Sequence, residues 1–291
     1  MACAKPVPAH WSPTATALRQ ERLHLHYGPI DLLIDVDGDD ASVRAAHGAA
    51  QSRFDGVLET LVSELPQLRT ALSAESIEPC GPVAKIMWRA CLPYANHFVT
   101  PMAAVAGAVA DYMLNAIVQA APNAKRVWVN NGGDIALWLS PAAKARIAVF
   151  QNSAEQSATV TLNANDGVSG IATSGWTGRS HSLGIADAVT VLASTAAEAD
   201  VAATLIANAV QLPSPVLDKQ FVTRTAANEL QPDSDLSDKL VTTSVSTLPK
   251  SLCQTAVQSG LNEARQLMKK TSLVGVFIDC QGHRLSLGDL T

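Results

Sequence analysis

Two adjacent glycines in the middle of the chain, Gly132 and Gly133, form the first segment that could bind a ligand. They lie in the sequence Asn-Asn-Gly-Gly-Asp at 130–134, between two expected strands at 126–130 and 135–139. Adjacent glycines expose backbone N–H groups with no side chain in the way, which suits the close approach of a phosphate or a flat ring. A plain hairpin turn needs the same glycine dihedrals, so the turn taken alone favours the structural interpretation.

A loop rich in glycine, serine and threonine at 170–184 is the second such segment. It gathers hydroxyl groups with the guanidinium of Arg179 and the imidazole of His181, and these groups could bind a ligand together. Ser174, His181 and Asp187 invite comparison with a hydrolytic triad. However, Ser174 is not in a G-x-S-x-G turn, and the three residues lie in one short stretch, whereas triads are assembled from distant segments. A triad is therefore disfavoured.

The third segment is an expected helix that begins with the capping box at 195–198 and runs to about Val210. Asp200 and Thr204 are four residues apart, so they lie on one face of that helix. Both are hard oxygen ligands suited to Mg²⁺, which takes few protein groups and completes its octahedron with water and phosphate oxygens. Such a pair is more often a helix carboxylate beside a threonine that bonds back to the backbone.

A pair of histidines, His24 and His26, falls on one face of an expected strand near the start of the chain. Alternate strand residues point to the same side, so the two imidazoles could share a metal ion. No third ligand is evident in the sequence. An ordinary solvated strand face is therefore the favoured interpretation.

The elements that position these segments follow from local pattern. Alternation over 23–36, interrupted at Gly28-Pro29, predicts a hairpin, and helical spacing predicts one helix from Ala41 to Leu65. Thr100-Pro101 is a helix start, and the helix that follows is apolar on every side up to Asp111, so it must be buried. Gly107 within it costs about 1 kcal/mol relative to alanine, which indicates that another part of the chain approaches its backbone closely.

The remaining assignments concern the later part of the chain. Pro213 to Lys250 is rich in proline, serine and aspartate and is interpreted as an irregular peripheral arm. The other expected elements are strands at 146–150, 159–162 and 187–193, a helix at 251–270, and a hairpin at 273–279 and 283–287 that turns at Gln281-Gly282.

Composition excludes several classes of protein. The chain has 291 residues, of which 47% are hydrophobic and 16% charged, and its net charge is −5. These values are typical of a folded protein, and the negative charge gives no support to nucleic-acid binding. Five scattered cysteines form no C-x-x-C pair, so a zinc site or a disulfide framework is not expected. The N-terminus lacks a secretory signal and the longest apolar run, Met102 to Ala110, is half a membrane span, so we expect a soluble cytoplasmic protein.

Taken together and in order, these segments resemble the ApbE family of flavin transferases, first described as thiamine-biosynthesis lipoproteins. Segment 129–135 looks like the family's V-N-x-G-G-[DE]-I turn, and 171–175 looks like its A-T-S-G segment, with Ser180-His181 like the S-H that follows. Segment 199–204 is similar to the metal motif A-D-A-L-A-T, and 107–111 is similar to the G-Y-A-x-D of a buried helix.

The resemblance implies an α+β fold of two lobes, in which mixed or antiparallel sheets pack against helices. The whole chain, 1–291, would be a single domain around a motif core at 100–208. The implied ligands are FAD or FMN and Mg²⁺, because the family cleaves the FAD pyrophosphate and transfers FMN to a threonine hydroxyl of a target protein, releasing AMP. By carry-over, Asp200 and Thr204 are metal ligands, and His181 and Asp200 are catalytic. The residues expected at the flavin nucleotide are Asn130, Gly132, Gly133, Asp134, Thr173, Ser174 and Gly175.

Departures from the family pattern leave the reaction open. The family usually has lysine where this chain has Ala106, and its D-P-x-T-G after S-H is replaced at 184–187. The chain has no lipobox, so it resembles a shortened cytosolic branch of unassigned function. Three hypotheses follow: FMN transfer to an acceptor flavoprotein, a flavin- or nucleotide-binding accessory protein without turnover, and an enzyme on the same scaffold acting on another small molecule. The alanine-rich helices are compatible with a homodimer but do not require one.

Overall fold

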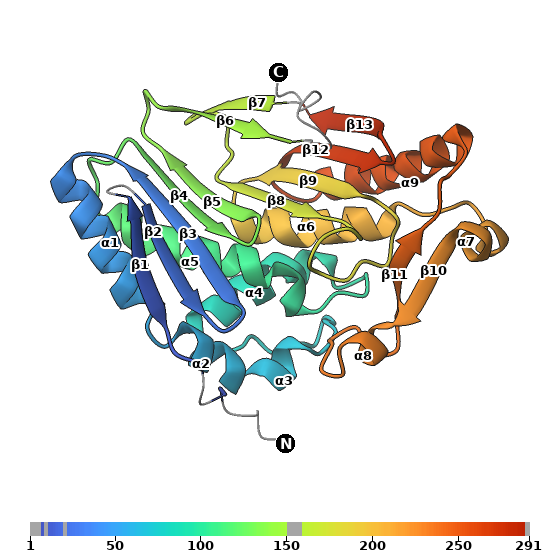
Figure 1. Cartoon of the computed structure of the whole chain (residues 1–291), viewed down its shortest axis with the longest axis horizontal. Helices are drawn as coiled ribbons and strands as arrows, with labels where there is room; N and C mark the ends of the chain where they lie inside the picture. The colour runs from blue at the N-terminus through green and yellow to red at the C-terminus, as the bar shows by residue number, and fades with distance from the viewer. Residues whose placement is uncertain (1–6, 9–10, 20–21, 150–158, 289–291) are drawn as a thin grey trace. The chain divides into compact units, whose positions relative to one another are not determined.

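The computed structural model describes residues 7–8, 11–19, 22–149 and 159–288 (Figure 1). The chain divides into two compact units. Unit 1 comprises Met1–Ala145, Leu162–Ile171 and Ser194–Glu198, and unit 2 comprises Arg146–Thr161, Ala172–Ala193 and Ala199–Thr291. The N-terminal segment 1–6 and the predicted strand end at Phe150 lie outside the described residues.

The sheet of unit 1 is antiparallel. Its strand order is β1 (Thr14–Arg19), β2 (Arg22–Tyr27), β3 (Ile30–Asp37), β4 (Arg126–Asn131), β5 (Asp134–Leu139) and the first residues of β8 (Gly170–Ser174). The predicted hairpin at 23–36 is confirmed as β2 and β3. Strand β3 also pairs with β4, which brings Leu33 opposite Asn130. Residues from the start and the middle of the chain therefore share one sheet.

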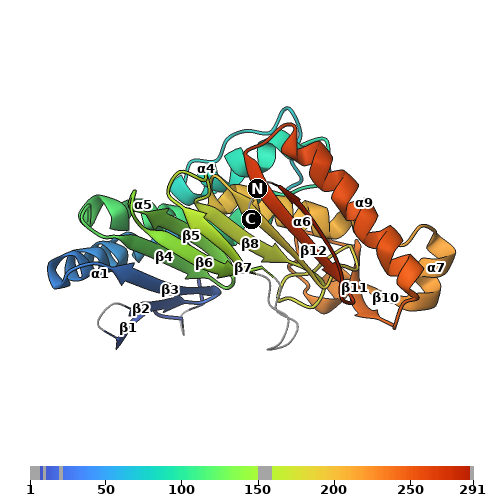
Figure 2. The ribbon, with the colours of Figure 1, turned by 90° about the horizontal axis from the view of Figure 1, so that it is seen from above.

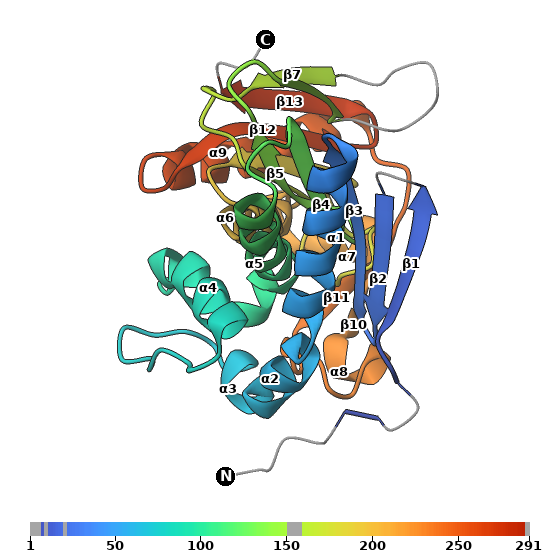
Figure 3. The same cartoon turned by 90° about the vertical axis from the view of Figure 1, so that its left-hand side faces the viewer.

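The helices of unit 1 are α1 (Asp40–Phe54), α2 (Val57–Ser63), α3 (Leu65–Leu68), α4 (Pro82–Cys91) and α5 (Val105–Ala120), with short 3₁₀ turns η1 (Leu92–Tyr94) and η2 (Pro101–Ala104). The single helix predicted over 41–65 is wrong. Gly56 adopts φ 75° and begins α2, so the chain breaks between α1 and α2 although the apolar spacing continues. Helix α1 packs along α5 (Figure 3).

Helix α5 continues past Asp111 to Ala120, further than the apolar run in the sequence. Of the described residues, one stretch, Pro101–Ala120, is long and apolar enough to cross a membrane by length and composition, and half of it is buried in the protein. The close approach predicted at Gly107 is confirmed. A Cβ there would collide with the carbonyl of Ala196 and come within 2.7 Å of the Ala197 nitrogen. Only glycine allows this contact between α5 and the segment 194–198.

In unit 2, the strands β9 (Ala188–Ala193), β12 (Leu273–Cys280) and β13 (His283–Gly288) pair antiparallel in that order. Helix α9 (Lys250–Met268) packs against β12 and β13 (Figure 2). The predicted C-terminal hairpin is confirmed, and its turn places Gln281 and Gly282 at φ 49° and 80°. Both angles are in the left-handed region, which explains the glycine.

The segment 213–250, defined as the arm, is not irregular as predicted. It forms α7 (Pro215–Phe221), β10 (Val222–Ala226), α8 (Ala227–Leu230) and β11 (Leu240–Val245), and β10 pairs antiparallel with β11. The loop predicted at 170–184 begins as strand β8. The remaining elements are α6 (Ala196–Ala209) and the pair of strands β6 (Lys144–Ala148) and β7 (Thr159–Asn163). The predicted α+β class, with antiparallel strands packed against helices, is confirmed.

Candidate functional site

The turn between β4 and β5 is built as the sequence predicts. Gly132 and Gly133 have φ 68° and 119°, both in the region that favours glycine. The backbone nitrogen of Gly133 donates to Oδ1 of Asn130 at 2.8 Å, which closes the turn. Both glycines are exposed, and a Cβ on Gly133 would have no heavy atom within 4 Å. The turn thus presents open backbone to solvent, with Asp134 partly buried beside it.

Asn131 anchors this turn to helix α5. Its side chain is 7% exposed, and Nδ2 donates to the carbonyl of Ala106 at 3.1 Å. Ala106 is therefore adjacent to the glycine turn, although the two are far apart in the sequence. Ala106 is partly exposed, and it occupies the position where the family that the sequence motifs resemble usually has lysine.

Asp111 on α5 holds the start of helix α6. Its carboxylate accepts from the backbone nitrogens of Ala196 at 3.0 Å and Ala197 at 2.9 Å. These N–H groups have no partner within a helix, so a carboxylate placed here satisfies them and complements the helix dipole. Asp111 lies in the segment 107–111 that resembles a buried-helix motif, and the sequence pattern alone assigns it no role. The available signal was its position as a lone acidic residue at the end of an apolar run.

Burial raises the pKa of Asp111 to about 6, against the two hydrogen bonds from Ala197 and Ala196, which lower it, while the charge of Glu198 raises it further. Glu198 belongs to the predicted capping box. The hydroxyl half of that box is present, because the Glu198 nitrogen donates to Oγ1 of Thr195 at 3.2 Å. The carboxylate of Glu198 accepts from the hydroxyl of Ser194 instead of reaching back to Thr195.

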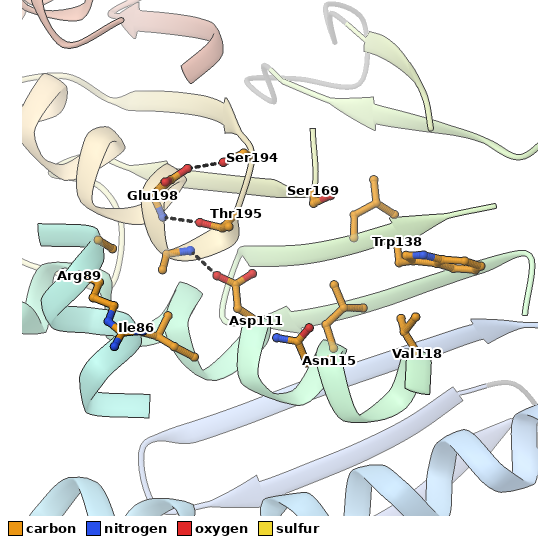
Figure 4. A pocket seen from close by; sticks show the side chains of 14 residues that line it. Ile86, Arg89, Asp111, Asn115, Val118, Trp138, Ser169, Ser194, Thr195 and Glu198 are labelled. Carbon is orange, nitrogen blue, oxygen red and sulfur yellow. Dashed lines mark hydrogen bonds between the residues drawn. The ribbon is translucent and has the colours of Figure 1, made fainter. Parts of the chain in front are cut away.

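These acidic residues line a pocket of about 460 Å³ that lies wholly in unit 1 (Figure 4). Its apolar walls come from α4, α5 and β5, and its polar rim comes from the segment 194–198 and neighbouring loops. The lining residues are Ile86, Arg89, Ala90, Asp111, Leu114, Asn115, Val118, Leu137, Trp138, Ser169, Ser194, Thr195, Ala197 and Glu198. The site residues predicted from the sequence are not among them. The carboxylates of Asp111 and Glu198 accept hydrogen bonds from residues 194–197 of the same chain. This geometry favours a structural role, which is to hold the start of α6, over a catalytic one.

In unit 2, the end of β8 and the residue after it lie against β9 and the residue before it. Oγ1 of Thr173 lies 2.9 Å from Oγ1 of Thr190, and a Cβ on Gly175 would collide with the carbonyl of Asp187. Nε1 of Trp176 donates to Oδ1 of Asp187 at 3.0 Å. These contacts fix the entry of the loop that carries His181.

Asp187 is not part of a hydrolytic triad. One carboxylate oxygen accepts from the indole of Trp176 and the other accepts from the backbone nitrogen of Gln281. Burial raises the pKa of Asp187, and the two hydrogen bonds oppose that shift. Its hydrogen bonds thus go to groups other than His181, which agrees with the disfavoured status of the triad.

Asp200 and Thr204 occupy the same face of α6, one turn apart. The other residues between Ala199 and Ala207 are buried, whereas these two are partly exposed. The next position on that face is Asn208, whose Oδ1 accepts from the Leu183 nitrogen at 2.8 Å. A partly exposed carboxylate and hydroxyl on an otherwise buried helix fit the oxygen ligands that Mg²⁺ prefers.

One histidine of the pair on β2, His24, contacts a carboxylate. Nε2 of His24 lies 2.8 Å from Oδ1 of Asp31, and the ring centroids of His24 and His26 are 6.3 Å apart. Across the described ranges, no three or more histidine, cysteine, aspartate or glutamate side chains are grouped to hold a metal ion.

The predicted site residues therefore fall into two groups. Asn130, Gly132, Gly133 and Asp134 meet in one turn of unit 1, whereas Thr173, Ser174, Gly175, His181, Asp200 and Thr204 belong to unit 2. Within unit 2, the predicted residues lie on different elements. The end of β8 and the residue after it carry Thr173 to Gly175, whereas α6 carries Asp200 and Thr204. Their roles toward a ligand stay predictions.

Comparison with known proteins gives one family and several distant structures. The family described as "AbpE bacteria" matches residues 15–286. A UPF0280 protein of Methanopyrus kandleri is 35% identical over 181 residues, which cover 61% of this chain and 69% of the relative. The ApbE protein of Thermotoga maritima is similar with 11% identity and a TM-score of 0.43, covering 72% of this chain and 91% of that one. A variant of the flavin transferase ApbE from Vibrio cholerae is similar with 15% identity and a TM-score of 0.41, covering 68% and 86%.

Proposed function

The chain belongs to the family described as AbpE bacteria, and on that premise we propose that it binds a flavin nucleotide and transfers FMN from FAD to a hydroxyl of an acceptor flavoprotein. In this reaction the hydroxyl oxygen attacks the phosphorus of the FMN half. The P–O bond to the AMP half breaks, AMP leaves, and the hydroxyl proton passes to a base. His181 is the residue proposed as that base.

The observation that carries the proposal is the Asp200–Thr204 pair. It is the polar interruption of an otherwise buried helix segment, and its two residues stand at the Asp and Thr positions of the A-D-A-L-A-T metal motif in the family that the sequence resembles. The carboxylate of Asp200 and the hydroxyl of Thr204 would hold Mg²⁺. When bound, the ion would neutralise the charge that builds on the pyrophosphate.

The glycine turn gives independent support. Its exposed backbone at Gly132 and Gly133 lets a phosphate or an isoalloxazine ring approach without meeting a side chain. The turn is fixed on both sides, by Asn130 within it and by Asn131 toward α5. A rigid, open turn is preorganised for a ligand, so little entropy is lost on binding.

The test is release of AMP from FAD, followed by chromatography with and without Mg²⁺ and with candidate acceptor proteins. We expect Asp200→Asn to abolish the Mg²⁺-dependent release and Thr204→Val to weaken it. Asp238→Asn, an exposed change in the arm, is the charge-matched control and should match the wild type. Absence of AMP under every condition, together with absence of flavin binding, would refute the proposal.

A second candidate is a flavin-binding accessory protein without turnover. The specific observation in its favour is Ala106, whose backbone accepts from Asn131 next to the glycine turn and whose side chain carries no charge, where a lysine would supply a positive one. A protein that quenches flavin fluorescence on binding but releases no AMP would support this candidate over the transferase.

A further inference from the structure

The imidazole of His181 has few contacts that fix its position. The preceding residues 177–180 are exposed, and within the described part of the chain no hydrogen bond involves the His181 ring. The backbone directly after it, by contrast, is held firmly. The position of His181 is therefore set by what binds residues 182–184.

Residues 182–184 are clamped by α6 and by the arm. The Leu183 nitrogen donates to Oδ1 of Asn208 at 2.8 Å. The backbone nitrogen of Thr242, on β11, donates to the Ser182 carbonyl at 2.8 Å, and its hydroxyl donates to the Gly184 carbonyl at 2.7 Å. A Cβ on Gly184 would collide with the α6 backbone, so this segment is also tightly packed.

Arg224 is the centre of the clamp. Its side chain is 13% exposed, and Nη1 donates to the Leu183 carbonyl at 2.6 Å and to Oγ1 of Thr242 at 3.0 Å. Nη2 donates to Oε1 of Gln211 at 2.9 Å and to Oδ1 of Asp218 at 2.8 Å, and Nε donates to Oδ2 of Asp218 at 2.9 Å. All five N–H groups of the guanidinium are thus engaged, in a planar pattern that a lysine cannot reproduce.

We propose that Arg224 is a positioning residue for His181, and that the arm serves the reaction by fixing the backbone after that histidine through Leu183. The proposal rests on the proposed function, in which His181 takes the proton of the acceptor hydroxyl. Misplacement of a catalytic group by about 1 Å can cost roughly a hundredfold in rate, so the clamp governs kcat more than flavin affinity. The arm accordingly has a role in the site, although it contributes no residue that touches the reacting atoms.

The first experiment compares Arg224→Lys with Arg265→Lys, an exposed arginine on α9, as the matched control. When the assay is run well below the unfolding temperature of the variant, the kcat for AMP release should fall roughly ten- to a hundredfold in Arg224→Lys. The dissociation constant for FAD should stay within about twofold of wild type. The NMR signals of the His181 ring, identified with a His181→Gln variant, should move in Arg224→Lys and stay in place in Arg265→Lys.

A second pair of variants guards against loss of folding. Thr242→Val removes the hydroxyl that joins Gly184 to Arg224, whereas Thr242→Ser keeps it and should restore both the rate and the His181 signals. If these signals and kcat equal those of wild type while only the unfolding temperature falls, Arg224 is merely structural and the proposal is overturned. If wild type neither binds flavin nor releases AMP, the proposed function fails, yet the His181 signals still decide whether Arg224 sets the histidine's position.

Discussion

Replacement of Asp111 by asparagine should change how the stability of the protein depends on pH. The carboxylate of Asp111 accepts from two backbone nitrogens at the start of α6, at 3.0 and 2.9 Å. Asparagine has a similar shape and keeps one oxygen acceptor, but it cannot ionise. The substitution therefore removes the titration of this site while leaving much of the contact between α5 and α6 intact.

The magnitude follows from the pKa. Burial raises the pKa of Asp111 from 3.8 to about 6, in spite of the opposing amide hydrogen bonds. Between these values the folded state binds more protons than the unfolded state. The stability contributed by the protonated form is fully present below the unfolded pKa and is lost as the pH rises through the folded pKa. A shift of about two pH units corresponds to at most about 3 kcal/mol, at roughly 1.4 kcal/mol per unit.

The assay is urea unfolding of both proteins at intervals from about pH 4 to pH 7.5, a range that covers most of the interval between the two pKa values and extends above the folded one. Loss of one acceptor should cost the variant about 1 kcal/mol at every pH. The free energy of unfolding of wild type minus that of the variant should be largest near pH 4 and should fall by up to about 3 kcal/mol by pH 7. Asp238→Asn, at an exposed site, should run parallel to wild type. If the Asp111→Asn curve also runs parallel, the carboxylate has an ordinary pKa and the reasoning is wrong.

Three further predictions concern unit 1. Gly107→Ala forces a methyl group into the carbonyl of Ala196, and should lower the free energy of unfolding by roughly 1–3 kcal/mol, measured by urea titration. Gly133→Ala meets no neighbouring atom but must hold φ 119°, and should cost roughly 1–3 kcal/mol by the same assay. Ala106→Lys adds positive charge beside the glycine turn, and should tighten FAD binding by roughly two- to fivefold at low salt, an effect that 1 M salt removes in fluorescence titrations.

Much of the fold could be predicted because its signals are local. The hairpins, the buried α5 and the capped α6 each depend on residues within one element. The helix predicted over 41–65 failed at Gly56, because the apolar spacing of α1 continues in phase into α2 and only the left-handed backbone reveals the break. Periodicity reports which face is buried and is silent about a change of axis.

The arm failed for a different reason. Its proline, serine and aspartate content is typical of irregular chain, yet Val222–Ala226 and Leu240–Val245 carry the β-branched residues that suit paired strands. The contacts that fold it join distant positions, such as Arg224 with Leu183. The same limit applies to Asp111, whose partners Ala196 and Ala197 are separated from it by most of the motif core. A local sequence pattern does not predict contacts between residues that lie far apart in the chain.

The cap formed by Asp111 constrains how a nucleotide could be recognised. The start of a helix is a ready anion site, because its free N–H groups and dipole favour negative charge. In α6 the first amides, of Ala196 and Ala197, already donate to a carboxylate of the protein. A phosphate there would have to displace Asp111 and leave its charge unpaired in a partly buried position. In the proposed function, phosphate recognition by this helix must therefore act through the face that carries Asp200 and Thr204. Recognition through an acidic residue depends on a cation, so chelation of Mg²⁺ should weaken FAD binding in a fluorescence titration.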